Sequence, residues 1–178
     1  GINAVIFGPD RPLADALSAL SGATHLLGSV PPDENGDPVL ARHGSDIEAM
    51  EGVSWVGYLS STGVYGDTGG KPVSEDSDVN PTSDRGRYRT EAEAAWLALA
   101  SDHRLPVHVF RLAGIYGPGR SALDQVRAGR AKRIDKPGHM FSRIHVDDIA
   151  QVLKASMDRP DPGAVYNVCD DEPAAAAD

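Results

Sequence analysis

Residues 54–66 read SWVGYLSSTGVYG, an apolar run that passes into hydroxyl residues and a glycine-containing turn. A continuous apolar run is typical of a strand in a parallel sheet that is covered on both faces. Ligands of open α/β sheets bind beyond the carboxyl ends of such strands, where hydroxyls can hydrogen-bond a substrate. The alternative is that the same hydroxyls only end the strand and cap the turn. The stretch therefore predicts a buried parallel strand with a candidate ligand site at its end.

Four further apolar runs predict buried strands, at residues 4–7, 25–27, 107–112 and 164–168. Helix-forming or helically spaced apolar residues lie between them, at residues 13–20, 37–50, 90–100 and 147–157. Asp37 is the expected N-cap of the second helix, and Asp147 or Asp148 that of the last. Strands that alternate with helices predict βαβ units, and hence an α/β fold with a mainly parallel sheet.

Composition narrows the classes of partner. The chain has 178 residues, a formal net charge of −9 and an isoelectric point of about 5.0. A duplex-binding surface needs a positive field, so we expect no nucleic-acid partner, although a local arginine cluster can still attract an anionic small molecule. No run approaches the ~20 apolar residues that cross a membrane, so no membrane association is expected and the cytoplasm is the default compartment. The single cysteine, Cys169, and the absence of zinc-type spacing predict no disulfide and no metal site.

The turn after the first predicted strand lacks the form of a dinucleotide site. Residues 7–10 read FGPD, with one glycine where the dinucleotide fingerprint has three. Pro9 also removes a backbone N–H that a phosphate would use. An ordinary strand-to-helix turn is the favoured interpretation.

Charged residues are concentrated at residues 81–93, which read PTSDRGRYRTEAE. If this segment is helical, Arg85, Tyr88, Arg89 and Glu93 share one face, because they are three or four residues apart. The alternative is a solvated charged face with a weak Arg89–Glu93 ion pair.

Taken in order, these motifs resemble those of the extended short-chain dehydrogenase/reductases, the NAD-dependent epimerase/dehydratase group. SSTGVYG and residues 81–93 are similar to that family's active-site strand and helix. RLAGIYGPG at 111–119, RIHVDDIA at 143–150 and VYNV at 165–168 resemble its later signatures. The resemblance runs from residue 1 to about residue 172. It implies a partial Rossmann-like, doubly wound, mainly parallel sheet.

The resemblance further implies one NAD(P)-binding domain over residues 1–178, with small substrate-side elements around residues 113–145. The implied cofactor is NAD or NADP and the implied partner a small-molecule substrate. Ser61 falls on the family's catalytic Ser/Thr, and Glu93 matches its helix glutamate. Gly114 stands where many members have a substrate-contacting asparagine, and Phe141 where sugar-nucleotide enzymes often have a phosphate-binding arginine.

The catalytic Tyr/Lys pair of the family is replaced by Arg85 and Arg89. Arginine stays protonated at any working pH, so Arg85 cannot donate and accept a proton as tyrosine does. Tyr88 is a candidate substitute acid, since flanking cations would lower its pKa. Alternatively, Arg85 and Arg89 clamp an anionic substrate such as a carboxylate. The expected catalytic residues are thus Ser61, Arg85, Tyr88 and Arg89. The cofactor is expected to lie against Ser29, Pro31, Ser60, Arg89 and Gly114.

The amino-terminal part also departs from the family. Residues 4–7 resemble the family's third strand, which its strand order separates from the run at residues 25–27 by two further strands. Without those two strands, residues 4–7 would have no neighbour. We therefore expect a βαβ unit with the glycine fingerprint before Gly1 and a continuation beyond Asp178. The 178 residues alone are expected to bind dinucleotide poorly, because the phosphate cradle belongs to that unit.

The leading functional expectation is an atypical NAD(P)-dependent oxidoreductase or epimerase-like protein that acts on a small polar or anionic substrate. Ser61 would hydrogen-bond the reacting oxygen, Arg89 would hold the cofactor ribose, and Arg85 would bind substrate or stabilise developing negative charge. The alternative is a non-catalytic NAD(P)-binding or sensor protein that kept the fold without the Tyr/Lys pair. A third possibility is a structural subunit, a homodimer through the family's helix-pair face.

Overall fold

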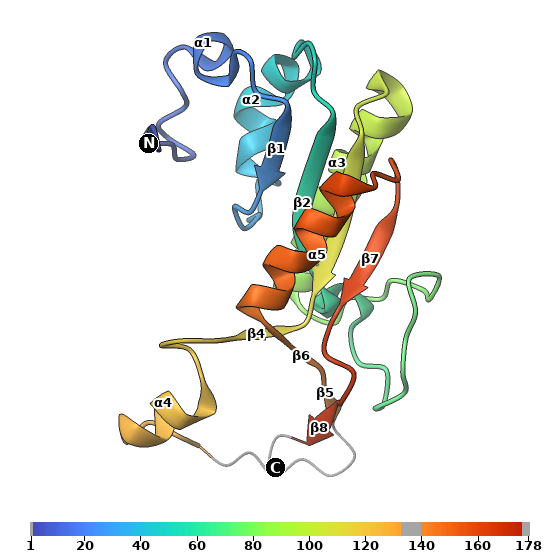
Figure 1. The fold of residues 1–178 in the computed structure, drawn as a ribbon. Helices are drawn as coiled ribbons and strands as arrows, with labels where there is room; N and C mark the ends of the chain where they lie inside the picture. Colours follow the sequence, from blue (N-terminus) through green and yellow to red (C-terminus); the bar gives the residue numbers. More distant parts are fainter. Residues whose placement is uncertain (1, 133–139, 176–178) are drawn as a thin grey trace.

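The computed structural model describes residues 2–132 and 140–175 of the chain, and a four-stranded parallel sheet forms its centre (Figure 1). The strand order is β1-β2-β3-β7, and the strands are β1 (His25–Gly28), β2 (Trp55–Ser61), β3 (Val107–Leu112) and β7 (Val165–Val168). All four carboxyl ends therefore lie at one edge of the sheet, with Ser61 opposite Leu112. This confirms the parallel α/β sheet for four of the five predicted runs.

Helices cover both faces of the sheet, as the doubly wound expectation requires. On one face, α2 (Pro38–Glu48) and α3 (Asp84–His103) pack against the sheet around the buried rings of Tyr58 and Trp96. On the other face, α5 (Val146–Asp158) packs over Trp55 and Phe110. Figure 1 shows α5 in front of the sheet and α3 behind it. The largely apolar sequences of β2 and β3 follow from this two-sided cover.

The helices begin close to where capping residues predict. The first helix, α1, is short (Ala16–Leu20), and Asp37 caps α2 by accepting hydrogen bonds from the N–H groups of Val39 and Leu40. The third helix, α3, begins six residues before the predicted position 90, because the Ser83 hydroxyl caps it at the Gly86 N–H.

The predicted cap of α5 was wrong. Its N-cap is His145, whose Nδ1 accepts the Asp147 N–H at 3.2 Å. Asp147 and Asp148 lie in the first turn instead, where negative charge also favours the helix dipole.

Smaller elements follow the carboxyl ends of the sheet (Figure 1). The 3-10 helix η1 (Thr62–Tyr65) continues directly from β2. Beyond β3, β4 (Gly114–Tyr116) pairs with β6 (Arg143–His145), and β5 (Met140–Phe141) pairs with β8 (Ala174–Ala175). The helix α4 (Ala122–Arg127) buries none of its residues. Part of the segment expected on the substrate side, residues 133–139, lies outside the described residues.

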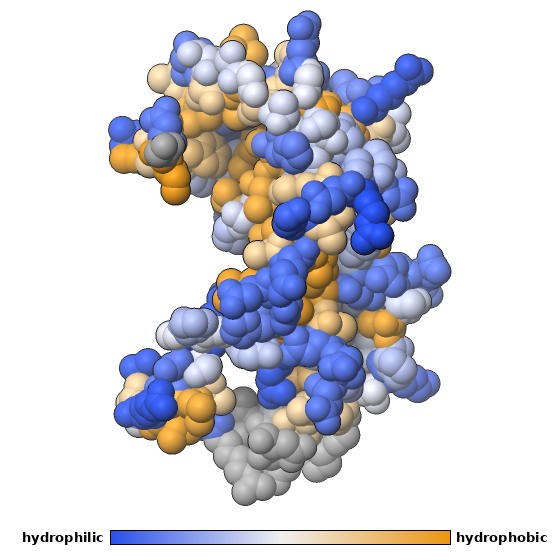
Figure 2. Space-filling model, viewed as in Figure 1, coloured by the Kyte–Doolittle hydropathy of each residue, from blue (hydrophilic) through white to orange (hydrophobic). Residues whose placement is uncertain are grey.

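The prediction of a strand at residues 4–7 was wrong. These residues adopt no strand, and Val5 and Ile6 are 59% and 68% exposed. The physical reason is the missing neighbour, because among residues 2–132 and 140–175 β1 pairs only with β2 and no strand lies beside the amino-terminal segment. That segment is instead held to α2, where the Leu13 N–H donates to His43 Nε2 at 3.0 Å. Figure 2 shows hydrophobic surface on the amino-terminal part of the molecule.

Across residues 2–132 and 140–175, no helix combines the length and the apolar character that crossing a membrane would take.

Candidate active site

A cleft of about 480 Å³ lies where β2 ends and α3 begins. Pro31 and Pro32 enter it from the segment after β1, and Ser61 enters it from the end of β2. The rest of its lining comes from the turn after β2 and from the first two turns of α3, namely Gly63, Ser83, Arg85, Gly86 and Arg89. The cleft therefore has the position that the carboxyl edge of a parallel sheet gives to ligand sites.

The two serines of the cleft are both N-caps. The Ser61 Oγ accepts the Gly63 N–H at 3.1 Å and caps η1, and the Ser83 Oγ accepts the Gly86 N–H at 3.1 Å and caps α3. A hydroxyl that accepts in this way keeps its own O–H proton for a further acceptor.

Gly86 lets α3 come close to η1. A Cβ at this position would lie 2.9 Å from the carbonyl oxygen of Gly63 and 2.9 Å from the Cβ of Pro81. No larger side chain fits there without a shift of the backbone. The close approach sets the distance between the two sides of the cleft.

Arg89 is held in place by β2. Its Nη1 donates to the Tyr58 hydroxyl at 3.1 Å and to the Leu59 carbonyl at 2.9 Å, and its guanidinium lies 5.7 Å from the centre of the Tyr58 ring. Tyr58 in turn stacks on Trp96, whose indole N–H donates to the buried carboxylate of Asp37. Burial raises the pKa of Tyr58 to about 12, although Arg89 acts in the opposite direction. The phenol thus stays protonated and supports the arginine from the protein side.

Arg85 lies one turn earlier on the same helix and is exposed. Its nearest acidic neighbour in sequence, Asp84, is engaged with Arg87 at 3.0 Å. Within the part of the chain that the structure describes, no side chain or carbonyl forms a hydrogen bond or ion pair with the Arg85 guanidinium.

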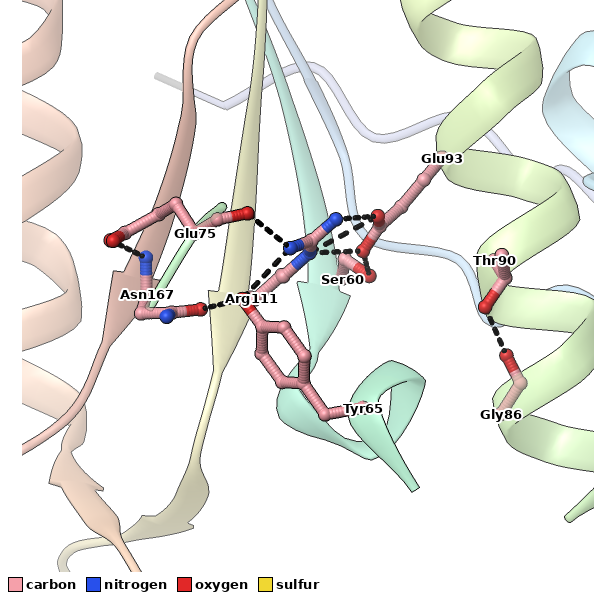
Figure 3. Close-up of polar contacts among 8 residues, drawn as sticks. All are labelled: Ser60, Tyr65, Glu75, Gly86, Thr90, Glu93, Arg111 and Asn167. Carbon is pink, nitrogen blue, oxygen red and sulfur yellow. Dashed lines mark hydrogen bonds and ion pairs between the residues drawn. The ribbon is translucent and has the colours of Figure 1, made fainter. Parts of the chain in front are cut away.

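A buried polar network connects β2, α3 and β3 (Figure 3). The Ser60 hydroxyl donates to Glu93 Oε1, and the Arg111 guanidinium donates to both oxygens of Glu93, with Nη2 2.9 Å from Oε2. Burial alone would lower the pKa of Arg111, but the hydrogen bonds that it donates to Glu93 and Tyr65 outweigh burial and raise it. Glu93 is therefore the partner of Arg111, and the Arg89–Glu93 pair considered from the sequence does not form.

The network continues to β7 and to the loop after η1. Arg111 Nη1 donates to the Tyr65 hydroxyl at 2.8 Å, and that hydroxyl donates to Asn167 Oδ1 at 2.7 Å. The Glu75 carboxylate accepts the Asn167 N–H at 2.7 Å. Sequence reasoning missed Arg111, Asn167 and Glu75 as a connected set. The available signal was Arg111 itself, since a charged residue inside an apolar strand requires a buried partner.

The predicted site residues divide into two groups. The structure brings Ser61, Arg85, Arg89 and Pro31 together in the cleft. The other predicted site residues lie outside the cleft, namely Tyr88, Ser29, Ser60 and Gly114. Tyr88 is half-buried with the Arg87 guanidinium 5.3 Å from its ring centre, and Ser29 is exposed outside the lining. Ser60 belongs to the buried network, and Gly114 is in β4, with its N–H bonded to the Ser142 carbonyl at 3.1 Å.

Acidic side chains gather at a different hollow, of about 650 Å³, between β4, α5 and the segment after β7. Its lining includes Asp148, Asp170, Asp171 and Glu172 together with Cys169. Partial burial raises the pKa of the Cys169 thiol, and the charges of Asp170 and Glu75 add to the rise, so the thiolate is disfavoured. Among the residues that can be placed, no three His, Cys, Asp or Glu side chains are arranged to hold a metal ion.

Comparisons with known proteins agree with this fold. Residues 47–169 match the model of the NAD dependent epimerase/dehydratase family. Protein YeeZ of Escherichia coli K12 is 35% identical over 115 residues, which are 63% of this chain and 38% of that protein. A solved structure of a functionally unknown conserved protein from Silicibacter pomeroyi DSS is 60% identical, with a TM-score of 0.81 over 86% of this chain and 54% of that one. The chain thus spans about half the length of that protein, and less of YeeZ.

More distant solved structures share the fold at low identity. RMD from Pseudomonas aeruginosa, complexed with NADPH, is 18% identical, with a TM-score of 0.72 over 95% of this chain and 65% of that one. UDP-glucuronic acid 4-epimerase from Bacillus cereus, in complex with NAD, is 17% identical, with a TM-score of 0.74 over 92% of this chain and 59% of that one. At such identities the likeness is one of architecture.

Proposed function

This chain belongs to the NAD-dependent epimerase/dehydratase family, and on that premise we propose that it carries the substrate side of an atypical NAD(P)-dependent oxidoreductase or epimerase-like enzyme. The observation that carries the proposal is the shared cleft of Ser61, Arg85 and Arg89 at the carboxyl end of β2. The substrate is a small polar molecule with a hydroxyl or carbonyl at the reacting carbon.

The described residues fit one end of the cofactor. Besides its bonds to Tyr58 and Leu59, Arg89 lines the cleft with hydrogen-bond donors that have no partner in the described part of the chain. These donors suit the hydroxyls of the nicotinamide ribose. The turn at Gly8 does not suit the pyrophosphate, because the N–H groups of Gly8 and Arg11 bond each other's carbonyls and Pro9 has no N–H. NAD and NADPH, bound in the two distant relatives, supply or accept a hydride in this type of chemistry.

The chain's own residues have separate tasks in this proposal. The Ser61 O–H donates to the reacting oxygen, since the hydroxyl accepts the Gly63 N–H and keeps its proton free. Arg89, fixed by Tyr58 and Leu59, orients the ribose. Arg85 stands where the family has its tyrosine. It cannot exchange a proton, and so it acts by binding the substrate or by stabilising negative charge that develops on it.

A non-catalytic NAD(P)-binding or sensor protein is the second candidate, and one observation favours it. No phenol lines the described part of the cleft, because Tyr58 is buried against Arg89, Tyr65 is bonded to Arg111 and Asn167, and Tyr88 lies outside the lining. A protein that has lost the proton-transferring group can retain the fold and the cofactor without turnover.

Titration of the full-length protein with NADH and NADPH, followed by a substrate screen, tests the proposal. Binding of either dinucleotide together with turnover supports an enzyme, and Ser61→Ala is then expected to lower kcat/KM by about 10²-fold or more. Ser45→Ala, an exposed serine on α2, is the matched control and should leave turnover unchanged. Tight dinucleotide binding without turnover of hydroxy or oxo compounds would favour the non-catalytic binding or sensor protein. Failure to bind either dinucleotide would contradict both.

A further inference from the structure

We propose that the cleft between η1 and α3 recognises a carboxylate on its substrate. Arg85 and the hydroxyl of Ser83 hold the carboxylate, while Arg89 binds the cofactor ribose and Ser61 the reacting oxygen. The inference rests on the proposed function for the identity of this cleft as the substrate site, and it specifies the class of substrate. The ligand is a small hydroxy or oxo compound with the carboxylate close to the reacting carbon.

The polar side chains of the cleft offer mainly hydrogen-bond donors. Each serine hydroxyl accepts a backbone N–H, from Gly63 or from Gly86, and has its proton free for a further acceptor. The other two polar side chains are the guanidinium groups of Arg85 and Arg89, which have no acceptor at all. A site made of donors is complementary to a group made of acceptors, and an ionised carboxylate is such a group.

Charge favours the same ligand. The lining contains two arginines and no carboxylate in a chain whose formal net charge is −9. The acidic residues in the first half of α3 are engaged elsewhere, since Asp84 and Glu91 pair with Arg87 and Glu93 pairs with Arg111. The cationic cleft is therefore a local exception on an acidic protein, and a local cluster of this kind attracts anions despite the net charge.

The guanidinium of Arg85 suits a planar two-oxygen group. Within residues 2–132 and 140–175 it forms no hydrogen bond or ion pair, so its Nε and Nη2 can bind a carboxylate through two parallel hydrogen bonds. Arg89, one turn away and held by Tyr58 and Leu59, adds a second positive charge beside this group.

Isothermal titration of the full-length protein, without dinucleotide and at low ionic strength, tests this inference. The probes are malonate, its neutral dimethyl ester and inorganic phosphate. The variants are Arg85→Met and, as matched control, Arg87→Met, which removes an exposed arginine of the same helix that lies outside the cleft. We expect malonate to bind the wild type and Arg87→Met equally, and to bind Arg85→Met about tenfold or more weakly. The dimethyl ester should not bind.

Equal malonate affinity in Arg85→Met and wild type would overturn the inference, and so would binding of the dimethyl ester as tightly as malonate. Tighter binding of phosphate than of malonate would overturn the carboxylate assignment in favour of a phosphorylated ligand. Thermal unfolding of each variant verifies that the fold is intact. Because no dinucleotide is present, failure here leaves the NADH and NADPH titration of the proposed function to be judged separately.

Discussion

Arg111 and Glu93 form a buried ion pair between β3 and α3, with Nη2 2.9 Å from Oε2. Their side chains are only 7% and 4% exposed. The pair fixes the helix that carries Arg85 and Arg89 onto the sheet that carries Ser61. Its integrity therefore affects both the stability of the fold and the geometry of the cleft.

Replacing Glu93 by Gln removes the only carboxylate that the described structure places on Arg111. Breaking a buried pair leaves an uncompensated charge, so the free energy of unfolding should fall by about 3–5 kcal/mol in urea denaturation. Glu91→Gln is the control, since Glu91 is exposed and 4.0 Å from Arg87, and it should change stability by less than about 0.5 kcal/mol. Equal stability of the two variants would mean that the pair does not support the fold.

Tyr58 should resist ionisation at high pH. Burial raises its pKa to about 12 from an ordinary value of 10.0, so the folded state holds the phenol proton more tightly than the unfolded state. Its contribution to stability is therefore fully present below pH 10.0 and is lost as the pH rises towards about 12. Phenolate absorbance measured during alkaline titration checks this, with Tyr58→Phe identifying the late-titrating group. If all the tyrosines ionised near pH 10, this result would contradict the buried position of Tyr58.

His108 should make the protein less stable in acid. Its Nδ1 donates to the Val56 carbonyl and its Nε2 accepts the Asp161 N–H, so the folded protein holds the neutral ring, and burial lowers its pKa. The unfolded state then binds the extra proton first, and stability falls as the pH drops below the ordinary histidine value of 6.5. Urea denaturation at about pH 8 and about pH 5 should show a smaller loss in His108→Gln than in the wild type. An equal loss in both proteins would exclude His108 as the cause.

Gly86→Ala should separate α3 from η1. The added Cβ meets the Gly63 carbonyl oxygen at 2.9 Å, so the free energy of unfolding should fall by about 1–3 kcal/mol despite the better helix propensity of alanine. Gly44→Ala in α2 is the matched control, because nothing lies within 4 Å of its Cβ, and it should be neutral or stabilising by up to about 1 kcal/mol. Chemical denaturation of both variants compares them. A stabilised Gly86→Ala would show that the close approach is not enforced.

Local pattern predicted much of the fold. Two-sided burial of β2 and β3 could be predicted from their largely apolar sequences. The helix cap at Asp37 could be predicted from its position before Pro38. The prediction of a strand at residues 4–7 was wrong because an apolar tetrapeptide forms a strand only beside another strand. Local sequence pattern does not show whether such a neighbour is present. His145 as a cap was missed because aspartate is the commoner cap residue.

The cleft was partly predictable from the sequence, whereas the polar network around Arg111 and Glu93 was not. Helical spacing placed Arg85 and Arg89 on one face, and strand termination placed Ser61 opposite them. The network joins positions far apart in sequence, such as Tyr65 with Asn167 and Ser60 with Glu93, and these pairings depend on strand order and register. Local periodicity contains no information about either.

The most direct test of the proposed active site is a crystal structure of the full-length protein with NADH or NADPH bound. The nicotinamide ribose is predicted to lie against the Arg89 guanidinium, with the nicotinamide ring facing the Ser61 hydroxyl in the cleft between η1 and α3. A dinucleotide bound away from this cleft, or a cleft that stays closed to the nicotinamide in a cofactor-saturated crystal, would contradict the assignment of Ser61, Arg85 and Arg89 as the site of chemistry.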